Sequence, residues 1–188
     1  GSYADADQPG IRLYEFSPAS GALSERGSVA GIANPSFLAL HPNGTALFAV
    51  SETAAPNGPP GGVRALRFDR ATGSFELLNE QPSGGNWPCH LCIDPSGRWL
   101  IASNYGSGSV GVFPIAEDGS LGAHTDLVQH RGSGPNPQRQ EGPHAHSATP
   151  TPDGQLILVA DLGVDQLGVY QLDTDKGTLA RQGTVAAP

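Results

Sequence analysis

The fold is decided by NPSFLALHPNGTALFAVS (34–51) and by two later stretches built the same way, WPCHLCIDPSGRWLIASN (87–104) and GPHAHSATPTPDGQLILVAD (142–161). Each contains a proline, a strand, a Pro-x-Gly turn and a second strand. The turn prolines are Pro42, Pro95 and Pro152, so the repeat is 53 to 57 residues long. Common propeller blades repeat every ~40 to 50 residues, so each unit has room for four strands and longer loops.

A second set of hairpins follows these stretches. GGVRALRFDRATGSFE (61–76), GSVGVFPIAEDGSLG (108–122) and LGVYQLDTDKGTLA (167–180) each pair a short strand with a turn at Gly73, Gly119 or Gly177. GIRLYEFSPASGAL (10–23) has the same form but lacks the two strands that precede it elsewhere. The sequence therefore predicts an all-β fold, a partial β-propeller of four-stranded antiparallel blades.

The repeat also predicts the domain organisation. We expect a single partial propeller domain over 1–188, in which 1–34 forms the outer half of one blade and 35–87, 88–142 and 143–188 form three further blades. A β-sandwich could use the same hairpins, but it does not explain a repeat of this length. About three and a half blades cannot close a ring at ordinary propeller curvature, so we expect a missing chain half or self-association to complete it.

Composition limits the function. The 188 residues are 37% hydrophobic and include 26 Gly and 17 Pro, which is typical of a turn-rich globular protein. The formal charge of -8 has the wrong sign for binding nucleic acid. No apolar run reaches the ~18 residues of a membrane span, so no membrane association is expected. The chain has no methionine and only two cysteines, so we expect a processed or truncated sequence and a cytoplasmic location.

Two apparent motifs are rejected. Gly106, Gly108 and Gly111 match a dinucleotide-binding fingerprint in spacing, but a strand rather than a helix follows them. Cys89 and Cys92 resemble half of a zinc site, yet an offset of three should place them on opposite faces of a strand. We therefore expect structural cysteines, no metal and no cofactor.

The histidine pair in QRQEGPHAHS (138–147) is the most informative feature. His144 and His146 are two residues apart and should point to the same side of an extended strand. Arg139 and Glu141 lie just upstream. Since innermost propeller strands line the central channel, these four residues are the candidate catalytic group. Two alternatives stay open: polar residues that satisfy loop carbonyls, and a His-x-His metal site.

Further residues are candidates for substrate binding. His90 lies early in the corresponding strand of the preceding unit, and Asn104 with Tyr105, and Asp161 with Asp165, follow the second strands of successive blades. These loop residues could bind a polyol or could cap turns through Asx hydrogen bonds.

The stretches QRQEGPHAHS, PDGQLILVADLGVDQLGVYQLD, SNYGSGSVGVFPI and HPNGTALFAVSE resemble the seven-bladed lactonase family, which includes bacterial 6-phosphogluconolactonase and the fungal carboxy-muconate lactonizing enzyme. The resemblance covers nearly the whole chain and implies about half of a seven-bladed ring. It also implies a metal-independent enzyme that acts on a lactone in the central channel.

Under this resemblance, His146 or Glu141 would take a proton from water, and Arg139, with Arg131, would hold anionic groups of the substrate in bidentate fashion. The leading function is hydrolysis of a sugar lactone, 6-phosphogluconolactone to 6-phosphogluconate, in carbohydrate metabolism. The alternatives are a lactonizing or delactonizing enzyme acting on a muconate-type substrate, and a non-catalytic binding scaffold.

Overall fold

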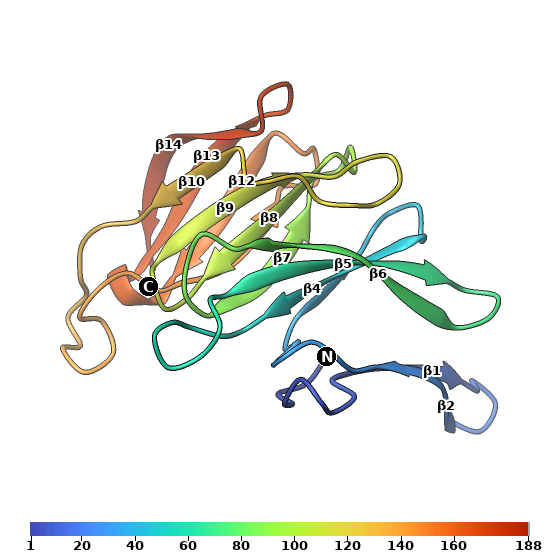
Figure 1. Ribbon diagram of the computed structural model, residues 1–188. Coiled ribbons are helices and arrows are strands. Elements are labelled where there is room, and N and C mark those ends of the chain that lie inside the picture. The colour runs from blue at the N-terminus through green and yellow to red at the C-terminus, as the bar shows by residue number, and fades with distance from the viewer. Residues whose placement is uncertain (188) are drawn as a thin grey trace.

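The computed structural model describes residues 1–187, and within them the chain forms fourteen strands and one short 3₁₀ helix. The strands are grouped in four separate antiparallel sheets, arranged like a fan (Figure 1). The first sheet has two strands, β1 (Ile11–Phe16) and β2 (Leu23–Val29). The second has four, β3 (Leu38–Leu40), β4 (Ala46–Ser51), β5 (Gly62–Asp69) and β6 (Ser74–Pro82).

The third and fourth sheets repeat this order. The third contains β7 (Pro88–Ile93), β8 (Trp99–Asn104), β9 (Ser109–Pro114) and β10 (Asp126–Gln129). The fourth contains β11 (Ala145–Pro150), β12 (Leu156–Asp161), β13 (Gln166–Asp173) and β14 (Thr178–Ala186), with the 3₁₀ helix η1 (Leu162–Val164) between β12 and β13. Within each sheet every strand pairs with the next one along the chain, and the three complete sheets lie within 35–87, 88–142 and 143–188.

Turn glycines explain why the hairpins form where the sequence places them. The Pro-x-Gly turns between the first two strands of each complete blade end in Gly44, Gly97 and Gly154, which have φ angles of 75°, 75° and 71°. Glycine adopts this left-handed conformation without the steric cost that a Cβ brings.

Apolar clusters join neighbouring sheets. One cluster, which includes Phe48 and Phe113, fills the space between the second and third sheets, and both rings are fully buried. Another joins the third and fourth sheets and includes Ile157 and Tyr170. Full burial of such a side chain stabilises the fold by about 1.5–3 kcal/mol, so packing between blades orders the fan.

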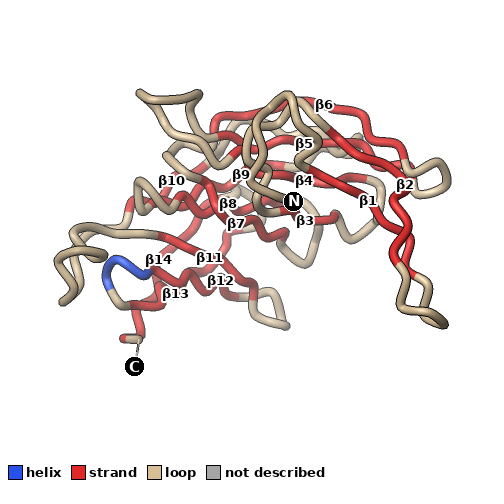
Figure 2. Tube along the Cα trace, turned by 90° about the horizontal axis from the view of Figure 1, so that it is seen from below, coloured by secondary structure: helices blue, strands red, loops and turns tan. Residues whose placement is uncertain are grey.

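The first strands of the complete sheets, β3, β7 and β11, lie side by side along the inner edge of the fan (Figure 2). This arrangement confirms the predicted all-β, partial propeller of four-stranded blades. Within the described residues β1 pairs only with β2, on one of its two edges. No helix in residues 1–187 is long and apolar enough to cross a membrane.

Candidate functional site

Two positions in each blade repeat face the same space at the inner edge of the fan. The first lies six residues before the turn proline and is occupied by Ser36, Cys89 and His146. The second directly follows the second strand of each blade and is occupied by Glu52, Tyr105 and Leu162. The residues at this second position donate equivalent backbone hydrogen bonds. The N–H groups of Glu52, Tyr105 and Leu162 donate to the carbonyls of Asn34, Trp87 and His144, at 3.1, 2.9 and 3.1 Å.

β-Bulges turn two of these side chains toward that space. In the β7–β8 ladder Pro88 pairs with Asn104 and His90 with Ser103, which leaves Cys89 unpaired. The β11–β12 ladder skips His146 in the same way. A bulge inserts one extra residue into a strand and re-aims its side chain, so the repeat presents one non-ladder residue at the same place in each of these blades.

Together these residues form a hollow of about 400 Å³, here called the inner pocket. All six repeat positions line it, and Tyr3 from the N-terminal segment and Arg139 from the loop after β10 complete it. The pocket thus combines an imidazole, a guanidinium and a carboxylate, from His146, Arg139 and Glu52, with an aromatic ring from Tyr105. Such a set can move protons and hold an anion.

Glu52 influences its neighbours in the inner pocket. It accepts a hydrogen bond from the Ser36 hydroxyl. The interaction of the Tyr3 hydroxyl with the Glu52 carboxylate raises the pKa of Tyr3, and partial burial acts in the same direction. Burial, followed by the nearby Glu52 charge, raises the pKa of Cys89 to about 12. The Cys89 thiol is therefore a protonated donor at neutral pH, and its Sγ lies 3.3 Å from the His146 carbonyl.

His144 lies behind the pocket wall. Its ring stacks on Tyr105 with centroids 4.4 Å apart, and its Nδ1 donates to the Tyr105 carbonyl at 3.0 Å. Its Nε2 lies 3.5 Å from a carboxylate oxygen of Glu141, whose side chain is 65% exposed. Tyr105 also presents its ring edge-on to His146 at a centroid distance of 6.0 Å. His144 therefore orients the aromatic wall beside His146.

A buried polar chain anchors this region. His130 Nδ1 donates to Asp161 Oδ2 at 2.6 Å, and His130 Nε2 then accepts from the Tyr170 hydroxyl at 2.9 Å. The other oxygen of Asp161 accepts from the backbone N–H groups of His144 at 2.7 Å and Gly163 at 2.9 Å. Burial opposes ionisation of Asp161, but these hydrogen bonds outweigh it and lower its pKa. Asp161 thus holds the backbone at His144, where the histidine pair begins.

The structure brings some of the predicted catalytic residues together and separates others. Arg139 and His146 line the inner pocket, together with Tyr105 from the predicted binding set. His144 and Glu141 contact each other outside the set of lining residues.

The other predicted binding residues do not line the inner pocket. Asp161 and Asp165 line an adjoining hollow, which shares His146 and Leu162 with the inner pocket. Asn104 is fully buried and donates to the Ser83 carbonyl and to Ser109. Asp161 is 3% exposed and caps η1, so both side chains organise turns in this structure. Asp165 has a left-handed φ of 51° and accepts a hydrogen bond from Gln140. Arg131 lines a separate small cavity beside His130.

His90 is half-buried on β7 and packs against Phe37 with ring centroids 4.2 Å apart and the planes tilted by 35°. Burial, together with the charge of nearby His146, lowers its pKa, so its ring is neutral at pH 7. Its counterpart relative to the turn proline is Ser147, whereas the counterpart of His146 is Cys89.

The cysteines differ from the sequence expectation. Cys89 contacts the carbonyls of Ala145 and His146, and Cys92 packs in the cluster between the third and fourth sheets. Both thiols thus face the same neighbouring blade, so the expectation of opposite faces was wrong because the bulge at Cys89 breaks strict alternation. Within residues 1–187 no three His, Cys, Asp or Glu side chains gather as a metal site would require.

Sequence reasoning missed Glu52, Ser36, Tyr3 and Leu162 and assigned Cys89 a purely structural role. A signal for most of them was present in the repeat. Aligning the three units on their turn prolines places Ser36, Cys89 and His146 in one column and Glu52, Tyr105 and Leu162 in another. Tyr3 has no such signal, because it reaches the pocket from outside the repeat.

The fold and the pocket define a class: part of a β-propeller whose inner strands help to line a polar pocket. The family model described as Lactonase, 7-bladed beta-propeller matches residues 1–188. The chain therefore belongs to this lactonase family.

Individual relatives agree with this assignment. The chain is 36% identical over 184 residues to the 6-phosphogluconolactonase of Bacillus subtilis, covering 98% of this chain and 51% of that protein. It is 32% identical over 176 residues to that of Formosa agariphila, with coverages of 93% and 49%. The solved periplasmic gluconolactonase of Pseudomonas aeruginosa superposes with a TM-score of 0.90 at 31% identity, over 100% of this chain and 54% of that one. The chain spans about half the length of the relatives it matches.

Proposed function

We propose that the protein containing this chain is a carboxylic ester hydrolase that opens a sugar lactone, with 6-phosphogluconolactone as its substrate. The observation that carries the proposal is the inner pocket, where His146, Arg139 and Glu52 line one hollow at the inner strands. The names of the two curated relatives support the choice of lactone. Because the chain spans about half of their length, the proposal concerns the complete ring.

In this proposal His146 acts as the general base. It removes a proton from water, the water oxygen attacks the lactone carbonyl carbon, and a tetrahedral oxyanion forms. The ring C–O bond then breaks, the ring oxygen receives the proton, and the product is a hydroxy acid. Glu141 is less suited to the role of base because its carboxylate is 65% exposed and it does not line the pocket.

Arg139 holds the anionic group of the substrate. Its guanidinium can meet a phosphate or a carboxylate with two parallel hydrogen bonds, and it lines the same hollow as His146. Glu52, which accepts a hydrogen bond from Ser36, adds a negative charge to the same hollow. It repels a phosphate, so we expect the phosphate to lie toward Arg139.

The test is hydrolysis of freshly generated 6-phosphogluconolactone by this chain and by its native-length form. We expect His146→Ala to lower kcat by about 10²–10⁴-fold, as loss of a general base does, and Glu141→Gln to have little effect. Arg139→Ala should raise KM for the phosphorylated lactone more than for gluconolactone. A folded native-length protein that does not accelerate hydrolysis, or that is unaffected by His146→Ala, would contradict the proposal.

A further inference from the structure

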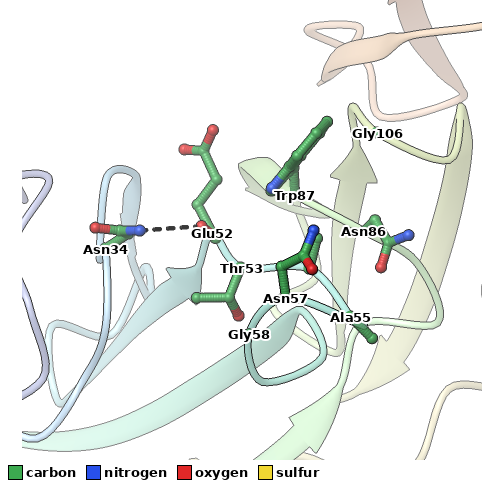
Figure 3. Close-up of a pocket in the computed structure, with 10 residues that line it drawn as sticks. Asn34, Glu52, Thr53, Ala55, Asn57, Gly58, Asn86, Trp87 and Gly106 are labelled. Carbon is green, nitrogen blue, oxygen red and sulfur yellow. Dashed lines mark hydrogen bonds between the residues drawn. The ribbon is translucent and has the colours of Figure 1, made fainter.

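A second hollow, of about 450 Å³, opens between the second and third sheets and is here called the Trp87 pocket. It is lined by the loop that follows β4, by Asn86 and Trp87 just before β7, and by Gly106 after β8 (Figure 3). Glu52 lines both this hollow and the inner pocket. Asn34, which precedes β3, completes the lining.

Trp87 is unusual in backbone and in exposure. Its φ is 50°, a left-handed conformation that is a genuine outlier for a bulky residue, and the residue is 49% exposed. The conformation is held by hydrogen bonds from Trp87 N–H to the Thr53 carbonyl and from Tyr105 N–H to the Trp87 carbonyl, both 2.9 Å long. The preceding blade has Asn34 at this position with φ 46°, and asparagine tolerates that conformation well.

Packing does not account for a tryptophan here, since a smaller residue would fit this backbone at lower cost and half of the indole faces solvent. Strained, exposed residues of this kind cluster at ligand sites. The indole is also held in place from one side: a Cβ at Gly106 would lie 2.6 Å from Trp87 Cε3. The backbone of Gly106 therefore supports the ring while the hollow remains open beside it.

The surroundings of the indole define the chemistry of a ligand. The side chains of Asn57 and Asn86 stand around the same space as the indole (Figure 3). Amides donate and accept hydrogen bonds and therefore suit hydroxyl groups. The residues that line this hollow include no lysine or arginine, and Glu52 is the one charged side chain among them, so an anionic ligand is disfavoured.

We propose that the Trp87 pocket binds an uncharged sugar ring, whose apolar C–H face stacks on the indole while its hydroxyls meet the asparagine amides. The site is distinct from the inner pocket, and binding there requires no lactone chemistry. Because Glu52 lines both hollows, a ligand with two sugar units could occupy the Trp87 pocket with one unit and reach toward the inner pocket with the other.

Binding of cellobiose to the 188-residue chain tests this inference. The chain has two tryptophans, and Trp99 is buried with its Nε1 donating to the Thr174 carbonyl at 3.0 Å. A Trp99→Phe variant, shown by circular dichroism to be folded, therefore reports Trp87 fluorescence alone. We expect a saturable fluorescence change with cellobiose and a weaker response to glucose 6-phosphate.

Saturation-transfer NMR then compares variants without relying on fluorescence. Trp87→Gly preserves the left-handed backbone and removes the ring, so binding of cellobiose should weaken by about tenfold or more. Tyr14→Ala removes another exposed aromatic side chain, on β1, and should leave binding unchanged. The proposal is overturned if folded Trp99→Phe shows no saturable response, or if Trp87→Gly binds cellobiose as tightly as the parent. It is also overturned if the part of the binding that Trp87→Gly abolishes is tighter for glucose 6-phosphate or adenosine than for cellobiose. None of these outcomes depends on lactone hydrolysis.

Discussion

Two substitutions of Asp161 separate the contribution of its hydrogen bonds to stability from the contribution of its negative charge. Asp161→Ala removes the acceptor of three buried donors, the His130 ring and the backbone N–H groups of His144 and Gly163. Asp161→Asn keeps one oxygen in place for both backbone donors. The asparagine also presents an NH₂ group to His130 Nδ1. The Nδ1 atom can accept this hydrogen bond if the imidazole proton moves to Nε2, which then donates to the Tyr170 hydroxyl.

These differences set the magnitudes. Removing one partner of a buried, hydrogen-bonded charge costs about 3–5 kcal/mol, so Asp161→Ala should lower the free energy of unfolding by that amount. Asp161→Asn loses only the charge assistance of the hydrogen bonds, and the expected cost is about 1–2 kcal/mol.

Urea unfolding followed by circular dichroism measures both effects, provided that the slope with urea is unchanged between variants. Asp153→Ala is the matched control: Asp153 caps an exposed turn by accepting from Thr151 and Gln155, and its loss should matter much less. An Asp161→Ala midpoint equal to that of the parent, or an Asp161→Asn variant as unstable as Asp161→Ala, would refute the reasoning.

The same residue predicts a pH dependence. The folded-state pKa of Asp161 lies below its unfolded value of about 3.9, so the unfolded chain binds the proton more readily. The stability that Asp161 contributes is therefore complete well above pH 4 and is lost as the pH falls through the folded-state pKa. The stability difference between the parent and Asp161→Asn should shrink on acidification below about pH 4–5, because asparagine does not titrate.

Three further outcomes are expected. Burial, and then the nearby Asp94 charge, raises the pKa of Cys92 to about 12, and burial likewise raises that of Cys89 to about 12. Iodoacetamide should therefore label neither thiol quickly in the folded chain at pH 7 to 8, and rapid labelling would contradict this. The His90 pKa should lie below about 6.5 in an NMR titration, and because the folded state disfavours the charged ring, its contribution to stability should decline as the pH falls below that value. Gly108→Ala should cost about 2–4 kcal/mol because φ is 60° and the new Cβ would overlap the backbone of the next blade. Gly21→Ala, at a φ of 72° with open space around it, should cost only about 1 kcal/mol, and similar costs for the two would exclude the overlap as the cause.

The fold could be predicted because its determinants are local. The left-handed turns at Gly44, Gly97 and Gly154 favour glycine, and the apolar strands on either side of them give each hairpin its length. The spacing of these turns then sets the length of the repeat, and therefore the boundaries of each blade. The identity of the residues that line the pocket depends instead on strand register, because a shift of one residue moves a side chain to the opposite face of the strand.

Asn104 and Asp161 illustrate the limit. They end their strands and point into the blades, whereas the next residues, Tyr105 and Leu162, line the pocket. The prediction named Tyr105 together with Asn104, and Asp165 together with Asp161. Of these four residues only Tyr105 lines the pocket, and in the fourth sheet Leu162 lines it instead. The bulges at Cys89 and His146 cause the same difficulty, because a repeat pattern does not show where a ladder skips a residue.

The bulged position has an evolutionary consequence. A residue that takes no part in the ladder can be exchanged without disturbing the pairing of the strands around it. Cys89 and His146 occupy the bulge in two successive blades, and Ser36, just before β3, occupies the same repeat position in the blade before them. Duplication of a blade followed by a single codon change there supplies a new functional group at a fixed place, so the chemistry of such a ring can diverge while its scaffold is inherited intact.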